Sequence, residues 1–298
     1  MLGITQYLAC HRISMDTIQG YVRPLGDGEC LLLVGSVAEG LANPESDLDL
    51  LLLANDRDAG EHELHGDMLR AMPEGFDLNI EVITHARAEA VCRFFLHNLN
   101  EARRPAAAGA PRSLTFVGAD ELRLLHRLRT GIPLIASANS VDTLRDCYAL
   151  HALPDFCTLQ HVACHLRLRA DASQTVQDAG DPHTPLVMSQ LAGQHLIAAV
   201  LASIGETNPN PKWLLRLLRD HRRMLQTFDP DRLIRLALPG AASSARDIVD
   251  ELQAVSEMTL ARLVIEAGRA GSPTAVALSD LLPRHPRVLP AEPVDCVV

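Results

Sequence analysis

The segment LLLVGSVAEGLANPESDLDLLLL, residues 31–53, decides the fold class of this chain. It begins within an unbroken apolar run, which is typical of a strand that is covered on both faces. The run ends at Gly35-Ser36, where glycine permits a sharp turn and the close approach of a ligand. A strand that passes through such a turn into a helix N-terminus presents donors for phosphate oxygens. We therefore predict that Gly35 and Ser36 bind a phosphate-bearing ligand.

The second half of the segment predicts a divalent metal site. Asp47 and Asp49 lie two residues apart, so in a strand both carboxylates project from one face. Leu48, Leu50 and Leu52 then point to the opposite face, into the core. Two carboxylates this close repel each other unless a cation lies between them, and Mg²⁺ prefers such oxygen ligands.

A third carboxylate is expected on the strand predicted from FDLNIEVI, residues 76–83. Its alternation places Asp77, Asn79 and Glu81 on one face and the apolar residues on the other. Glu81 lies between Ile80 and Val82, and we predict it as the third metal ligand. Asp77, on the same face, is the alternative.

In order and spacing, these elements resemble the nucleotidyltransferase superfamily that includes DNA polymerase beta and the aminoglycoside nucleotidyltransferases. The resemblance covers residues 30–83. It implies a small mixed sheet with helices and two Mg²⁺ ions held by Asp47, Asp49 and Glu81. It also implies attack of a hydroxyl on the α-phosphorus of a nucleoside triphosphate with loss of pyrophosphate, a displacement that two metal ions can clamp.

The chain changes character near Gly131 and Pro133. Strand and helix patterns mix before this point, with residues 57–71 expected to be helical, whereas apolar residues recur at helical spacing after it. We predict an α/β (α+β) catalytic domain over residues 1–135 and an all-helical domain over 136–283. The proline-rich stretch 284–298 is expected to be an extended tail.

Lys212 is the only lysine; the other 26 of the 27 basic residues are arginine. In NPNPKW, residues 208–213, Asn210 is a good helix N-cap and Pro211 suits the first helical position. A cation in the first turn opposes the helix dipole unless an anion is also present. We therefore predict that Lys212 binds the β- and γ-phosphates. An exposed lysine without a role, beside a packing Trp213, is the alternative.

Composition narrows the function further. The formal net charge of −10 argues against broad nucleic-acid binding and would suit a cationic substrate. The seven cysteines include no C-x-x-C pair, which is typical of free thiols in the cytoplasm. No apolar run is long enough to predict a membrane span, and no signal peptide is recognised. His161 and His165 lack the glutamate of the H-E-x-x-H zinc motif, so no metal is predicted there.

We expect a cytoplasmic, Mg²⁺-dependent enzyme that transfers AMP from ATP to a hydroxyl of a small molecule. Its partners would be the nucleotide and that acceptor, without membrane or nucleic acid. Alternatives are nucleotidylation of a protein or peptide, synthesis of a second-messenger nucleotide, and a nucleotide sensor that has lost catalysis. Related two-domain enzymes sometimes build sites across a homodimer, so that arrangement is also open.

Overall fold

The structure of the chain is a computed structural model that divides into two compact units. It describes residues 4–20, 29–55, 68–71, 77–104, 114–136, 140–177, 181, 183–238 and 244–282. Unit 1 is Met1–Leu96 with Asp120–His151, and unit 2 is His97–Ala119 with Ala152–Val298. The predicted extended tail, 284–298, lies outside the described residues.

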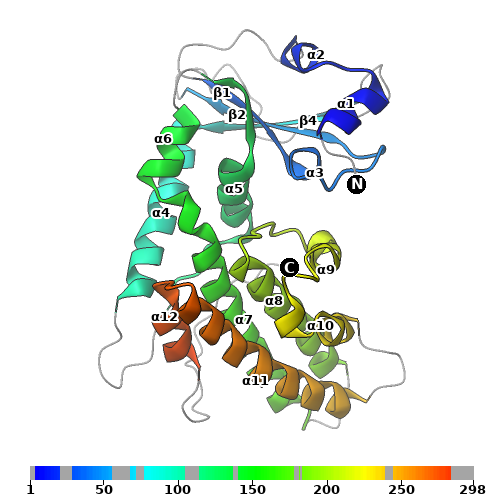
Figure 1. Ribbon diagram of the computed structural model, residues 1–298, viewed down its shortest axis with the longest axis vertical. Helices are drawn as coiled ribbons and strands as arrows, with labels where there is room; N and C mark the ends of the chain where they lie inside the picture. Colours follow the sequence, from blue (N-terminus) through cyan, green and yellow to red (C-terminus); the bar gives the residue numbers. More distant parts are fainter. Residues whose placement is uncertain are drawn as a thin grey trace. The chain divides into compact units, whose positions relative to one another are not determined.

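Unit 1 is built on a mixed sheet, as predicted, and its strands run in the order β3-β4-β2-β1-β5 (Figure 1). Only β2 and β4 pair in parallel; the other neighbours are antiparallel. The strands are β1 (Cys30–Val34), β2 (Leu48–Ala54), β3 (Met68–Ala71), β4 (Asp77–Thr84) and β5 (Ile132–Ala136).

Alternation along β2 gives the sheet its core. Leu48, Leu50 and Leu52 pack in one cluster with Tyr7 and Val37, which come from the helices of this unit. These helices are α1 (Ile4–His11), α2 (Met15–Gly20), α3 (Gly35–Ala38), α5 (Ala119–Thr130), α6 (Ser140–Cys147) and the first part of α4 (His85–Arg103), followed by the short 3₁₀ helix η1 (Leu150–Ala152). The apolar face is thereby buried, and the carboxylates of the same strands face the other way.

Two strands were not expected from the sequence. The helix predicted over 57–71 is wrong for its last residues, because 68–71 form β3, paired with β4 through backbone hydrogen bonds; residues 56–67 lie outside the described set. β5 follows directly on α5 and contains Pro133, which lacks an amide donor. An edge strand tolerates such a residue, and the ladder between β5 and β1 shifts register at Leu31/Leu32.

Unit 2 consists of helices joined by turns and loops, without a strand in its described residues, as the apolar spacing predicted. It contains the end of α4 together with α7 (Leu153–Thr175), α8 (Thr184–Ser203), α9 (Pro211–Asp220), the 3₁₀ helix η2 (Gln226–Phe228), α10 (Pro230–Ala237), α11 (Ala245–Arg269) and α12 (Thr274–Leu281). Residues 97–119 also belong here. The backbone of Val117 exchanges two hydrogen bonds with the Gln160 side chain of α7, at 2.8 and 3.0 Å.

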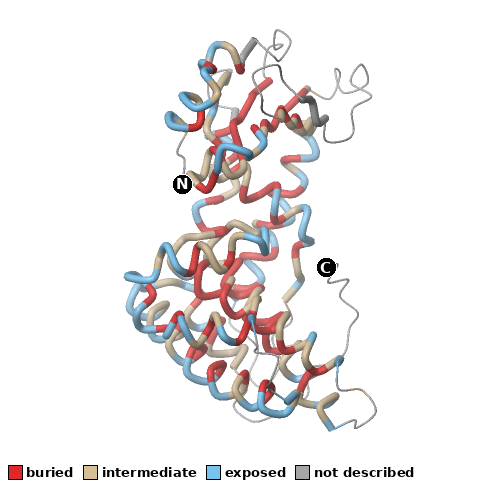
Figure 2. The backbone as a smooth tube through the Cα atoms, turned by 90° about the vertical axis from the view of Figure 1, so that its right-hand side faces the viewer, coloured by how far each residue is buried: buried red, intermediate tan, exposed pale blue. Residues whose placement is uncertain are grey.

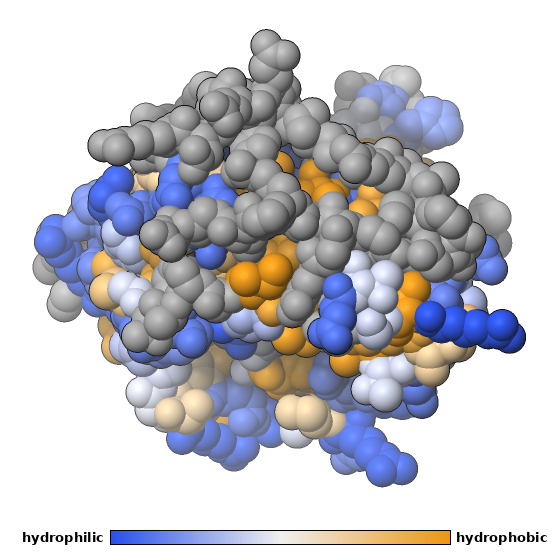
Figure 3. Space-filling model, turned by 90° about the horizontal axis from the view of Figure 1, so that it is seen from above, coloured by the Kyte–Doolittle hydropathy of each residue, from blue (hydrophilic) through white to orange (hydrophobic). Residues whose placement is uncertain are grey.

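Helix α8 is the central helix of unit 2, in contact with α7, α9, α10 and α11. In the described part of the chain it alone has the length and apolar composition to span a membrane, yet half of its most apolar window is buried inside the bundle. Buried backbone is concentrated in the strands of unit 1 and in the helices of unit 2 (Figure 2). Seen from above, the described surface is largely hydrophilic with smaller hydrophobic areas (Figure 3).

Buried His165 and Ser256 and partly buried Arg169 form a hydrogen-bonded group inside unit 2. His165 is fully buried; its Nδ1 donates to the Ala192 carbonyl at 2.8 Å, and its Nε2 lies 2.7 Å from the Ser256 hydroxyl. Arg169 also donates to Ser256, at 2.9 Å. Because the Ala192 carbonyl only accepts, these bonds make Nδ1 the protonated nitrogen of His165 and leave Nε2 to accept from Ser256.

Candidate active site

The Gly-Ser turn and the acidic strand meet at Asp49. Gly35 has φ +69°, and a Cβ atom added to it would lie 2.2 Å from Asp49 Oδ2. In the parallel register of β2 and β4, Asp49 stands opposite Asn79, and Asn79 Nδ2 donates to Asp49 Oδ1 at 3.1 Å. The carboxylate is thus held between a glycine that leaves room for it and an amide that orients it.

Tyr7 marks which other carboxylates lie near this point. The ring is fully buried, and its hydroxyl donates to the Ser46 carbonyl at 2.6 Å, one residue before Asp47. Burial and then the charges of Asp47, Asp49 and Asp77 raise the pKa of Tyr7 to about 12. Three aspartates therefore act on one hydroxyl group.

Helix α1 holds the segment that precedes Asp47 at a second point as well. The His11 ring lies 4.5 Å from the Tyr7 ring, centroid to centroid, and His11 Nε2 lies 3.0 Å from the Pro44 carbonyl. Within the segment, Asn43 Oδ1 accepts from the backbone of Glu45 at 2.9 Å. Nothing in the sequence around Tyr7 indicated this role, because a lone buried tyrosine is a common core residue.

Glu81, predicted as the third metal ligand, is engaged elsewhere. It stands opposite Leu51 in the register, two residues beyond Asn79, and its carboxylate forms an ion pair with Arg127 of α5. Among the residues that the structure describes, no three His, Cys, Asp or Glu side chains are gathered as metal ligands. This holds for Asp47 and Asp49 with Glu81 and equally for Asp47 and Asp49 with Asp77. The role of Glu81 as third ligand stays a prediction, and its carboxylate is paired with Arg127 in this structure.

Asp77, the alternative, is better placed. Counting back two residues from the Asp49–Asn79 pair along both strands brings Asp77 beside the segment that carries Asp47. Asn79 Oδ1 is buried and has no hydrogen-bond partner among the described residues. Carboxylate and amide oxygens are the donors that hard divalent cations prefer. The donor types at this edge of the sheet, in Asp47, Asp49, Asp77 and Asn79, therefore suit such an ion, and the three carboxylates would have to draw together to bind it.

Lys212 begins helix α9 as predicted. The Asn210 side chain caps the helix by accepting from the Lys212 amide at 3.1 Å, and Pro211 follows the cap. Lys212 Nζ lies 4.9 Å from the Trp213 ring centroid, and Arg216 approaches the same ring at 5.1 Å. Lys212 lies in unit 2 and Gly35 in unit 1. Its contact with a nucleotide stays a prediction.

Comparison with known proteins places this site in a class. Residues 17–94, which include the strands β1 to β4, helix α3 and the first half of α4, match the family model of the nucleotidyltransferase domain. No curated protein matches the chain. A solved structure similar to it is the nucleotidyltransferase-like protein from Exiguobacterium sibiricum, with 13% sequence identity, a TM-score of 0.44, and coverage of 87% of this chain and 77% of that one.

The chain therefore carries a nucleotidyltransferase domain and is a transferase. Enzymes of this kind transfer a nucleoside monophosphate from a nucleoside triphosphate. The matched residues contain Gly35, Ser36, Asp47 and Asp49, the residues by which the sequence resembled this class.

Proposed function

We propose that the chain transfers AMP from ATP to a hydroxyl of a small molecule, with release of pyrophosphate, in a Mg²⁺-dependent reaction. The observation that carries the proposal is the meeting of Gly35 with the Asp49 carboxylate, beside two further aspartates that act on Tyr7. Phosphoryl chemistry needs mainly positioning and charge stabilisation, and this edge of the sheet offers both.

Each residue has a definite task in this proposal. Asp47 and Asp49 would hold the metal ions, with Asp77 as third carboxylate and Asn79 Oδ1 as a neutral donor. When bound, the ions would neutralise the charge that develops on the attacking and leaving oxygens. Asn79 orients Asp49 through its 3.1 Å hydrogen bond. Gly35 leaves room for the Asp49 carboxylate directly beside the turn, and the triphosphate would bind at Ser36 of that turn.

The direct test is an assay of pyrophosphate release with Mg²⁺ and each of the four nucleoside triphosphates, with and without candidate acceptors. ATP should give the highest rate, and release should require an acceptor. Asp49→Asn should lower the rate by about a thousandfold, since it removes a charge from the reacting centre. Undiminished activity of Asp49→Asn would refute the assignment. Release without an acceptor would indicate nucleotide self-condensation instead.

Asp77→Asn and Glu81→Gln should separate the two candidates for the third carboxylate. We expect Asp77→Asn to weaken Mn²⁺ binding by at least about tenfold, measured by calorimetry without nucleotide, because it removes one charge from the ion. Glu81→Gln should leave Mn²⁺ affinity nearly unchanged. It should instead lower the free energy of unfolding by about 2 kcal/mol, because Arg127 loses its ion-pair partner in a partly buried position.

The opposite outcome, a loss of Mn²⁺ affinity in Glu81→Gln alone, would restore Glu81 as the third ligand. Arg127 would then have to release it when metal binds. Arg127→Met provides the matched control, since it breaks the same ion pair from the other side. If the pair is only structural, both variants lose stability and neither changes Mn²⁺ affinity.

Lys212→Ala tests the predicted phosphate contact. We expect the KM for the nucleotide to rise by about tenfold or more with the fold intact, because a charged contact to phosphate contributes about 1.5–3 kcal/mol. Arg216→Ala is the matched control, since it also removes a cation from the Trp213 ring. An unchanged KM in Lys212→Ala would show that Lys212 contacts the Trp213 ring but not the nucleotide.

The acceptor is proposed from charge alone. The chain carries a formal net charge of −10, which would attract a cationic small molecule and repel nucleic acid. We also propose that the enzyme is cytoplasmic, because the described cysteines are free thiols. An acceptor panel should therefore contrast amine-bearing polyols with neutral sugars at low ionic strength, where a charge preference is largest.

A further inference from the structure

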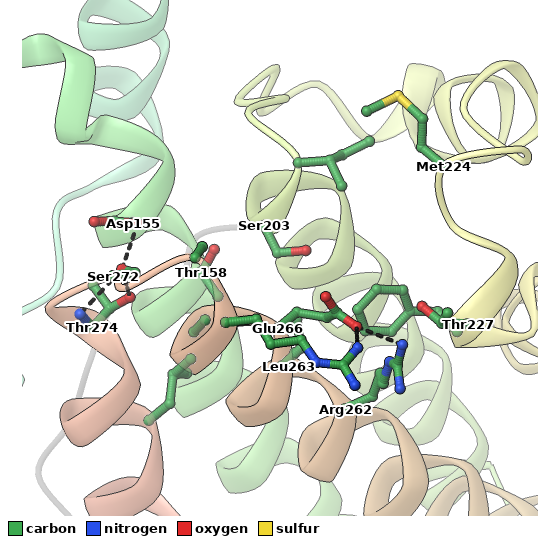
Figure 4. A pocket seen from close by; sticks show the side chains of 16 residues that line it. Asp155, Thr158, Ser203, Met224, Thr227, Arg262, Leu263, Glu266, Ser272 and Thr274 are labelled. Atoms are coloured by element: carbon green, nitrogen blue, oxygen red, sulfur yellow. Dashed lines mark hydrogen bonds and ion pairs between the residues drawn. The ribbon is translucent and has the colours of Figure 1, made fainter.

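Unit 2 contains a cavity that the proposed reaction does not use. Its volume is about 440 Å³, which is within the range of small-molecule sites. Its lining mixes apolar side chains with hydroxyl groups (Figure 4). The apolar lining comes from Ile204, Met224, Phe228, Leu263 and Leu278, and the hydroxyls come from Thr158, Ser203, Thr227, Ser272 and Thr274.

Two arginines in this cavity share a single carboxylate oxygen. Arg262 and Arg269 both contact Glu266 Oε1, at 2.5 and 3.3 Å. Figure 4 shows both contacts meeting at Glu266. One negative charge thus faces two positive charges. Arg262 Nε is also buried without a hydrogen-bond partner among the described residues, which is unfavourable for a polar group.

The other carboxylate of the cavity does not offset this surplus. Asp155 forms an ion pair with Arg103 at 3.3 Å and accepts from the Ser272 hydroxyl at 3.2 Å. Its charge is therefore already matched by an arginine outside the lining. In the part of the chain that the structure describes, the Arg262–Glu266–Arg269 group thus has one more positive than negative charge, beside the apolar side chain of Leu263.

We propose that this cavity binds a small organic anion, a carboxylate or phosphate carried on an apolar body. The anion would lie against Arg262 and Arg269, where guanidinium groups bind such oxygens in a planar, two-pronged manner. The apolar body would contact Phe228 and Leu263, and polar groups of the ligand would reach hydroxyls of the lining such as that of Ser203. This site is separate from the reacting carboxylates of unit 1 and does not depend on the transferase reaction.

The test uses benzoate as the anionic probe and benzylamine as its cationic counterpart, without Mg²⁺ or nucleotide. In protein labelled with ¹³C at the methionine methyl groups, benzoate should shift the signal of Met224, which lines the cavity. It should leave Met258, an exposed residue outside the cavity, unchanged. Benzylamine should shift neither. A Met224→Leu variant assigns the signal.

Arg262→Met should weaken benzoate binding by about tenfold or more, because a charged hydrogen bond is lost. Arg269→Met, at a mostly exposed side chain, provides a second variant if the first unfolds. Arg222→Met is the matched control, since Arg222 is paired with Asp231 and does not line the cavity. No Met224 shift with millimolar benzoate, an equal response in Arg262→Met, or a preference for benzylamine would each overturn the proposal.

Discussion

Gly35→Ala is expected to abolish nucleotidyl transfer almost completely, by about a hundredfold or more. The added methyl group would lie 2.2 Å from Asp49 Oδ2, and 3.0 and 3.1 Å from the Cγ and Cβ atoms of the same side chain. Rotation of the terminal oxygens alone does not relieve contacts that extend to Cβ. Asp49 would have to leave the position in which Asn79 holds it, and a displacement of about 1 Å at a reacting centre costs about this much rate.

Gly40→Ala is the control for this variant. Gly40 also has a positive φ, +71° against +69° for Gly35, but a Cβ atom added there meets nothing within 4 Å. Both variants should therefore lose about 1–2 kcal/mol of stability from the left-handed backbone. Only Gly35→Ala should lose pyrophosphate release and Mn²⁺ affinity. Equal activity in the two variants would show that the contact with Asp49 is not needed for catalysis.

The sequence predicted the part of this site that is local. Gly35-Ser36 and Asp47-Leu48-Asp49 lie on segments whose alternation fixes which way each side chain points, and the sheet keeps that direction. The helical unit was equally evident, because its apolar residues repeat at a period that only a helix buries. In both cases the sequence pattern lies in the same short segment as the strand or helix that it predicts.

The choice between Asp77 and Glu81 depended on residues far along the chain. Both share a face of β4, so periodicity could not separate them. What distinguishes them is the register against β2, which places Asn79 beside Asp49, and Arg127 on α5, which takes Glu81 into an ion pair. Strand register and the partner of a charge are tertiary properties. Tyr7 was missed for the same reason, since its hydroxyl acts on a loop 39 residues away.

The polar groups of the two units differ in how far they are exposed to solvent. In unit 1 the carboxylates stand at the start of two parallel strands, where Asp47 is exposed and Asp49 and Asp77 are partly buried. In unit 2 polar groups are enclosed and hydrogen-bonded to each other, as with His165, Ser256 and Arg169. A partly open carboxylate set can exchange a cation. In the enclosed network His165 accepts from Ser256 as a neutral ring, and protonating it would add a second positive charge close to Arg169.

That difference predicts that unit 2 loses stability steeply in mild acid. Burial lowers the pKa of His165 to about 4; the hydrogen bond to the Ala192 carbonyl opposes part of this effect, and the charges of Arg169 and then His195 lower the pKa by smaller amounts. Burial also lowers the pKa of His195 to about 4. Burial, and then the charge of His195, lowers the pKa of His161 to about 3. The Nδ1 atoms of His161 and His195 lie 3.0 Å apart. This hydrogen bond requires one of the two rings to be neutral, so that its Nδ1 can accept.

The direction in which stability changes with pH follows from the number of protons that each state binds. Each histidine has a lower pKa folded than unfolded, so below about pH 6.5 the unfolded chain binds more protons. These three histidines therefore do not lower the free energy of unfolding above about pH 6.5, and they lower it progressively as the pH falls toward 4. Between pH 7 and pH 5 each histidine costs about 2 kcal/mol. Three together cost about 6 kcal/mol, which is comparable to the whole stability of a typical domain.

Urea unfolding followed by circular dichroism from pH 7 to pH 5 measures this loss. The slope near pH 5 should correspond to the uptake of about three protons on unfolding. His165→Gln should be less stable at pH 7, because the Ser256 and Ala192 contacts change, yet its slope should fall by about one proton. His151→Gln, at an exposed position, should leave the slope unchanged. A wild-type slope of less than one proton would mean that these rings are already charged in the folded chain.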